Sequence, residues 1–228
     1  MTLTHEELEA IALSLRVSLA AVAASLPFAV AAAWLLARRD FAGKTLFDAV
    51  VHLPLVLPPV VIGYMLLLAF GAQGLGPMLE RLGIVFTFRW TGAALAAAVM
   101  GFPLMVRSIR LSMESIDPRI EAAGRTLGAG PWRAFFTLTL PLAWPGLVTG
   151  ALLGFARALG EFGATITFVS NIPGETQTLP LAIYGATQVP GGDAQALRLS
   201  IVAVVLSLGA LAASEWLVRR GARAGRRA

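Results

Sequence analysis

The sequence contains no cysteine and only two histidines, His5 and His52. The absence of cysteine excludes disulfides, iron–sulfur clusters and thiolate metal sites. Two histidines without an accompanying acidic cluster make a zinc or haem site hard to assemble. We therefore expect no metal centre and no other cofactor, and we interpret His52 as an interfacial or packing residue.

Charge is also scarce in this chain. Only 14% of the residues are charged, 57% are hydrophobic, and the mean hydropathy is +0.76. Soluble domains contain about 25% charged and about 45–50% apolar residues. A chain of 228 residues has too little interior to bury this much apolar surface, and disordered segments are poor in apolar residues. We therefore expect the lipid bilayer to be its main solvent.

Five long apolar runs account for most of this hydrophobicity. A membrane helix needs about 20 mostly apolar residues to cross about 30 Å of hydrocarbon. The sequence therefore predicts an all-α polytopic bundle with about five transmembrane helices, forming a single transmembrane domain over residues 1–228. The five runs are residues 11–37, 50–72, 91–111, 142–163 and 196–218.

The basic residues are distributed unevenly between the two sides of this five-helix arrangement. Cytoplasmic loops carry the excess of lysine and arginine, so the distribution predicts an N-terminus outside and a C-terminus in the cytoplasm. The bias also accounts for the net charge of +5 without a nucleic-acid partner. The predicted cytoplasmic residues are Arg38, Arg39, Lys44, Arg107, Arg110, Arg119, Arg125, Arg133, Arg219, Arg220, Arg223, Arg226 and Arg227.

One apparent nucleotide-binding motif is incomplete. The sequence Gly43-Lys44-Thr45 ends as a phosphate-binding P-loop does, but such a loop also needs a glycine five positions before Gly43. That position is Arg38, and a predicted membrane helix precedes it rather than a strand. We therefore expect no ATP site in this chain.

Prolines interrupt the second apolar run at Pro54, Pro58 and Pro59. Proline removes a backbone donor and crowds the carbonyl four residues earlier, so the helix should kink or break. Broken helices in transporters place free backbone dipoles along a pathway. Two interpretations stay open: a packing kink without substrate contact, or a pathway element at Pro58 and Pro59.

The fourth run carries small residues at every fourth position, namely Gly146, Gly150, Gly154 and Ala158. This spacing predicts a helix face that lets another helix approach closely.

Arg157 and Glu161 lie one helical turn apart near the outer end of the same run. Ionisable groups at membrane depth usually pair or face water. The spacing fits either a neutralising ion pair or an arginine that sets the electrostatics of an anion pathway. With Thr165, these residues are candidates for the pathway or its gate. The following segment, residues 164–195, is too polar for a sixth span, so we expect a gate-like element of short helices on the outer face.

Residues 112–141 form the longest predicted cytoplasmic connection. Asp117 is a suitable N-cap, Pro118 suits the first helical position, and Gly128 suits a stop, so a short helix is predicted over residues 119–127. Small side chains at Ala122 and Ala123 permit close docking, while arginines give the segment a charged rim. Composition alone does not distinguish a docking segment from a solvated loop.

This connection resembles the EAA motif of the permease subunits of bacterial ABC importers. The matching residues are Glu121-Ala122-Ala123, Gly128 seven residues after the glutamate, and a terminal Leu140-Pro141. The resemblance implies the type I importer permease fold and a coupling helix seated in a cleft of an ATP-binding subunit. The contact residues it implies are Glu121, Ala122, Ala123, Arg125 and Gly128.

Three further segments, residues 52–60, 126–130 and 159–176, are similar to permease subunits of molybdate importers. The resemblance implies alternating-access import of molybdate or tungstate by a homodimer in the bacterial cytoplasmic (inner) membrane. The implied partners are two ATP-binding subunits, which hydrolyse the ATP, and a periplasmic molybdate-binding protein. Sulfate and thiosulfate permeases are similar around residues 159–163 but are usually longer, so that alternative stays open.

An ion-coupled secondary transporter is a more distant alternative. It would need buried carboxylates for the coupling ion and usually an internal repeat. Glu161 is the only acid well inside the predicted spans, and no repeat is visible.

Overall fold

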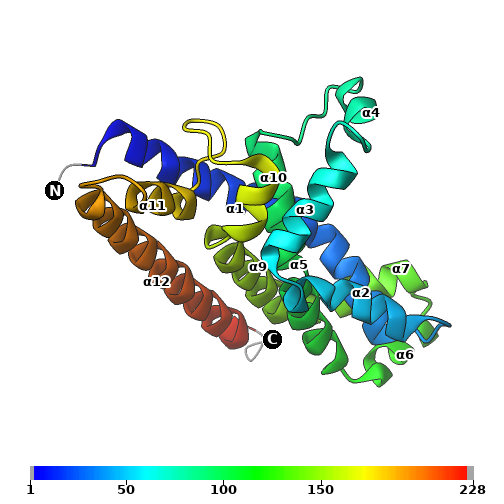
Figure 1. Ribbon diagram of the computed structural model, residues 1–228. Coiled ribbons are helices and arrows are strands. Elements are labelled where there is room, and N and C mark those ends of the chain that lie inside the picture. Colours follow the sequence, from blue (N-terminus) through cyan, green and yellow to red (C-terminus); the bar gives the residue numbers. More distant parts are fainter. Residues whose placement is uncertain (1–2, 225–228) are drawn as a thin grey trace.

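The computed structural model describes the backbone of residues 3–224 and the side chains of residues 3–213. Every regular element in this part of the chain is a helix, which confirms the all-α prediction (Figure 1). The elements are α1 (His5–Arg38), α2 (Lys44–Val56), α3 (Pro59–Phe70), α4 (Gly76–Glu80), α5 (Trp90–Glu114), α6 (Pro118–Thr126), α7 (Pro131–Ala134), the π-helix η1 (Phe135–Thr139), α8 (Leu140–Leu142), α9 (Trp144–Leu159), α10 (Gly163–Val169), α11 (Leu179–Thr187) and α12 (Asp193–Ala224).

Within the described residues, three helices are long and apolar enough to cross a membrane: α1, α5 and the 193–213 part of α12. Two more candidate spans are pairs of helices joined at sharp bends, of 114° between α2 and α3 and of 69° between residues 131–142 and α9. The five apolar runs thus correspond to three single helices and two bent pairs. The arginines at positions 219, 220, 223, 226 and 227 lie outside the described side chains.

The break predicted for the run at residues 50–72 is confirmed, because the chain turns between Val56 and Pro59, where successive prolines prevent the helix from continuing. The predicted span at 142–163 needs correction, since α9 has 16 residues and rises only about 24 Å. The preceding segment, residues 131–142, completes this candidate span at an angle.

The core lies where α5 packs between α1 and α9. A Cβ atom added to Gly150 would lie 3.1 Å from the Met105 carbonyl oxygen, and one added to Gly154 would lie 2.6 Å from the Met105 sulfur. Gly146 is equally close to Ser112. This confirms the predicted small-residue packing face of α9, which lies against α5.

The N-terminal half of α1 is fastened to α11 and α12. Thr4 and Glu7 form a capping box at the start of α1, and the buried Glu7 accepts a hydrogen bond of 2.8 Å from Arg198 of α12. The Ser14 hydroxyl oxygen accepts a hydrogen bond from the backbone N–H of Leu179 at the start of α11. Glu7 and Ser14 therefore hold the start of α1 against α11 and α12.

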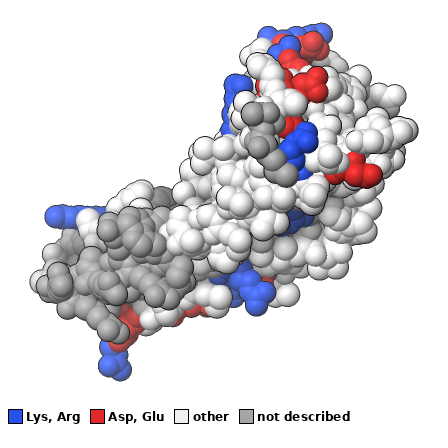
Figure 2. Space-filling view, turned by 90° about the vertical axis from the view of Figure 1, so that its left-hand side faces the viewer, with Lys and Arg blue, Asp and Glu red and all other residues white. Residues whose placement is uncertain are grey.

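The described surface suits a lipid environment. Most of the face in Figure 2 is uncharged, with charged groups gathered mainly at its two ends and a few basic groups between them. The outward side chains of α12, including Leu197, Val204, Val205 and Leu208, are at least half exposed. Exposed apolar residues in such density on a long helix indicate contact with hydrocarbon.

Candidate functional site

The predicted coupling segment is the helix α6, and residues within and next to it determine where it begins and ends. The Asp117 side chain accepts a hydrogen bond of 2.9 Å from the Arg119 N–H, and Pro118 occupies the first turn of α6. Gly128 follows the helix with φ +86°, a conformation that favours glycine. The predicted helix over residues 119–127 is confirmed to within one residue at each end. Figure 1 places α6 beside α7, at the end of the molecule opposite the N-terminus.

Glu121 of α6 points into the protein and joins three segments. Its Oε1 accepts hydrogen bonds from Arg38 Nε at 2.9 Å and from the Thr139 hydroxyl at 2.8 Å. Arg38 also donates to the Ile116 carbonyl oxygen at 3.3 Å. The Arg38 side chain is only 13% exposed and that of Glu121 25%, so the pair is partly shielded from water. Glu121 therefore links the coupling segment to the end of α1 and to η1.

The other residues assigned to coupling point away from this cluster. Ala122, Ala123, Arg125 and Gly128 are exposed, and the adjacent Leu127 is 88% exposed. A large aliphatic side chain left in water beside small residues and an arginine is typical of a docking surface. The structure thus divides the predicted set into one inward residue, Glu121, and an exposed face on α6.

Sequence reasoning missed Arg38 and Thr139 as members of this site. Arg38 was assigned to topology alone, and Thr139 lies within the motif region without matching a motif position. They are 83 and 18 residues from Glu121 in sequence. Two signals were present: an arginine at the last turn of an apolar helix, and a polar residue directly before Leu140-Pro141.

The second group of predicted residues gathers around the contact of α3 with α10. Pro59 begins α3, and a Cβ added to Gly163 at the start of α10 would lie 2.8 Å from the Pro59 Cβ. A Cβ added to Gly63 would lie 2.5 Å from the Ala164 carbonyl oxygen. The backbones of α3 and α10 therefore meet directly, with glycine on both sides of the contact. Pro58, by contrast, is exposed at the break.

Arg157, Glu161 and Thr165 lie at the junction of α9 and α10. Glu161 has a side chain only 1% exposed, forms an ion pair with Arg157, and accepts a hydrogen bond of 2.8 Å from the Ala164 N–H through Oε1. Its Oε2 faces Arg157 closely but has no hydrogen bond within the described residues. Thr165 is buried one turn further along. The carboxylate thus supports the start of α10 while its charge is balanced by an arginine that is 27% exposed.

His52 lies outside both groups. Its Nδ1 is 2.9 Å from the Asp48 carbonyl oxygen and 3.2 Å from Asp48 Oδ1, and Asp48 also pairs with Arg110 of α5 at 3.1 Å. The contacts of His52 thus lie within α2, and Asp48 is the residue that fastens α2 to α5.

Comparison with known proteins identifies the family of this chain. Residues 25–223 match the family model described as "Binding-protein-dependent transport system inner membrane component". The chain belongs to this family. The chain is 58% identical over 229 residues to the molybdenum transport system permease protein ModB of Escherichia coli (strain K12). This alignment covers 99% of this chain and 100% of the relative. The ModB protein of Haemophilus influenzae is 58% identical over 94% of each chain.

Other relatives of this inner membrane component are more distant. The sulfate transport system permease protein CysW of Synechococcus elongatus is 42% identical, covering 78% of this chain and 63% of the relative. Among solved structures, a bacterial ABC transporter involved in the import of alginate has TM-score 0.74, 17% identity, and coverage of 96% of this chain and 80% of its own. The methionine ABC transporter MetNI in inward-facing conformations has TM-score 0.68, 17% identity and 94% coverage of both chains. The fold is therefore that of an ABC importer permease.

Proposed function

We propose that this permease subunit carries molybdate, and tungstate as its close analogue, across the bacterial inner membrane. The observation that carries the proposal is the 58% identity over essentially the full length of a molybdenum transport permease. The proposed assembly is a homodimer with two ATP-binding subunits, which hydrolyse the ATP, and a periplasmic binding protein. Each copy forms one transmembrane domain with its N-terminus outside and its C-terminus in the cytoplasm.

The exposed face of α6 is the proposed contact with the ATP-binding subunit. Its small residues, Ala122, Ala123 and Gly128, let a partner backbone approach, and Arg125 supplies a charge at the rim. Glu121 would transmit a movement of α6 to the rest of the protein through its hydrogen bonds with Arg38 and Thr139. Movement of α6 with the ATPase would then displace the end of α1, which is how ATP binding and hydrolysis would alternate the access of the bundle.

The proposed anion pathway runs past the α3–α10 contact. The break at Pro58 and Pro59 ends one helix and starts another, and in transporters such interrupted helices place backbone dipoles along a pathway. Arg157, Glu161 and Thr165 lie on the α9–α10 side of the same contact, and the segment 164–195 is the proposed outer gate. A binding protein supplies selectivity in this scheme, so the membrane subunit needs no dense arginine cage.

Anion competition tests the substrate. We expect vesicles containing this chain, its ATPase and its binding protein to take up radiolabelled molybdate, with tungstate competing at similar concentrations and sulfate only at much higher ones. Sulfate or thiosulfate uptake in preference to molybdate would support the second candidate, a sulfate importer, which rests on the lower identity of 42% to a sulfate permease.

The role of Arg157 gives one prediction. We expect Arg157→Gln to reduce molybdate uptake severalfold, and the double variant Arg157→Gln/Glu161→Gln to regain thermal stability without regaining uptake. The single variant leaves the buried Glu161 carboxylate without its cation, and the double variant removes that carboxylate charge. A loss of stability can therefore be distinguished from a loss of transport. Normal uptake by the single variant would leave Arg157 with only a structural role, opposite Glu161.

The proposed membrane topology gives another prediction. Because the chain has no native cysteine, a single introduced cysteine is the only thiol that can be labelled. A cysteine at the exposed Glu175, between α10 and α11, should react with an impermeant maleimide added to intact cells. A cysteine at the exposed Thr126 of α6 should react only after the cells are permeabilised. The opposite labelling pattern would reverse the proposed orientation.

A further inference from the structure

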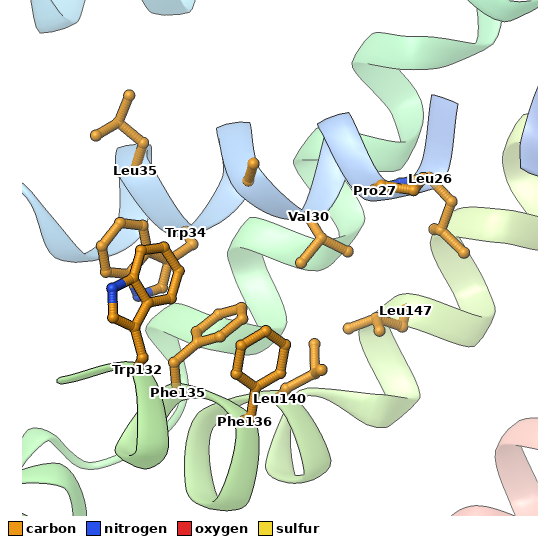
Figure 3. A pocket seen from close by; sticks show the side chains of 11 residues that line it. Leu26, Pro27, Val30, Trp34, Leu35, Trp132, Phe135, Phe136, Leu140 and Leu147 are labelled. Atoms are coloured by element: carbon orange, nitrogen blue, oxygen red, sulfur yellow. The ribbon is translucent and has the colours of Figure 1, made fainter. Parts of the chain in front are cut away.

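A groove runs along α1 on the side facing α7, η1, α8 and α9 (Figure 3). Its volume is about 620 Å³, and all eleven side chains that line it are apolar. Side chains of α1, such as Val30, lie across the groove from Leu140 and Leu147. The proposed coupling and pathway residues are absent from this lining, so the groove is a separate feature.

Aromatic side chains form one end of the groove wall and pack against one another. Trp34 stacks on Trp132 with centroids 6.4 Å apart and meets the edge of Phe135 at 5.8 Å, while Trp132 stacks on Phe136 at 6.5 Å. Trp132 and Phe136 nevertheless remain 69% and 58% exposed. A rigid apolar wall with this exposure is unfavourable in water and favourable against hydrocarbon.

The length of the groove corresponds to one leaflet of a bilayer. Its lining on α1 extends from Leu26 to Leu35. Nine residue steps of about 1.5 Å make about 14 Å, which is close to half of the roughly 30 Å hydrocarbon thickness.

A cationic cavity continues the groove at its Trp34 end. This second cavity, of about 640 Å³, shares Trp34 and Phe135 with the apolar groove. Its lining includes Arg38, Arg39, Arg125 and a single acid, Glu121. Glu121 is already paired with Arg38, so the cavity has an excess of positive charge. The Arg39 guanidinium lies 5.2 Å from the Trp34 ring, at the point where the two cavities meet.

We propose that this groove binds an anionic phospholipid, with an acyl chain along the apolar wall and the headgroup phosphate at Arg39. Arginine at the membrane surface attracts anionic headgroups and donates charge-assisted hydrogen bonds to phosphate. The lipid would contact both α1 and η1, the two segments that Glu121 ties to α6. In the proposed orientation this lipid would lie in the cytoplasmic leaflet, but the site itself does not depend on that orientation.

Native mass spectrometry of the full-length chain in detergent tests the site. The protein is supplied with equal amounts of phosphatidylglycerol and phosphatidylcholine. Retained phosphatidylglycerol should predominate. Ala31→Trp, which fills the groove, and Arg39→Gln, which removes the headgroup charge, should each reduce that retention at least fivefold. Ala24→Trp, elsewhere on the exposed surface of α1, and Arg107→Gln, an exposed arginine outside both cavities, serve as matched controls and should retain it.

A second measurement needs no variant. Phosphatidylglycerol with brominated acyl chains should quench the tryptophan fluorescence of the unmodified protein at a lower mole fraction than brominated phosphatidylcholine, because Trp34 and Trp132 line the groove. Equal quenching by the two lipids, or full retention by Ala31→Trp, would overturn the proposal. Conversion of a dimer to monomers by Ala31→Trp would assign the groove to a contact between copies instead, and would equally overturn it.

Discussion

Glu121→Lys is expected to reduce ATP-driven uptake at least tenfold while the chain still inserts in the membrane. The substitution places a cation beside Arg38 and deprives the Thr139 hydroxyl of its acceptor. Removing one partner of a charged hydrogen bond costs about 1–3 kcal/mol, and the repulsion between two partly shielded cations adds to this. The expected consequence is separation of α6 from the end of α1, so that movement of the ATPase no longer reaches the bundle.

Three measurements on the variant separate coupling from folding: membrane content, pull-down of the co-expressed ATPase, and uptake. Asp40→Lys is the matched control, because it makes the same charge change next to α1 at a side chain that is 99% exposed. It should leave uptake within twofold. Gly128→Asp should also lower uptake, by straining a position with φ +86° on the proposed docking face. Normal transport by Glu121→Lys would remove Glu121 from the coupling mechanism.

Gly63→Val is expected to abolish most transport by separating α3 from α10. An added Cβ would lie 2.5 Å from the Ala164 carbonyl oxygen and 2.9 Å from the Thr167 Cβ, and the first of these is a backbone atom. Overpacking of a close contact typically costs about 1–3 kcal/mol. We expect at least a tenfold loss of uptake together with a lowered Tm.

Gly209→Val provides the control for this substitution. Gly209 is also a helical glycine, in α12, but a Cβ added there meets no atom of the described residues within 4 Å. The control should transport normally and keep its Tm. Equal uptake by the two variants would mean that the α3–α10 contact does not contribute to the pathway.

Features encoded within a few residues were predictable. The helix α6 follows from Asp117, Pro118 and Gly128, because capping and termination are local effects. The break before Pro59 and the packing face of α9 follow from local sequence in the same way, as does the absence of a full span in residues 164–195, where α10 and α11 have 7 and 9 residues.

Features that depend on tertiary packing were not predictable from spacing. Nothing in the sequence pairs Arg38 with Glu121, since their contact depends on where α5 returns the chain beside the end of α1. The 114° angle between α2 and α3 is set by their neighbours, because proline determines only that the helix is interrupted. The bend after Leu142 does have a local signal, because Pro145 removes a backbone donor in the first turn of α9, but its angle of 69° is likewise set by packing.

Uptake by reconstituted vesicles tests the central claim most directly. Vesicles containing this chain, its ATP-binding subunit and the loaded binding protein should accumulate radiolabelled molybdate only when ATP reaches the ATPase. Omission of the ATPase, or replacement of ATP by a non-hydrolysable analogue, should abolish accumulation. Accumulation by vesicles that contain this chain alone, without ATPase or ATP, would contradict the account.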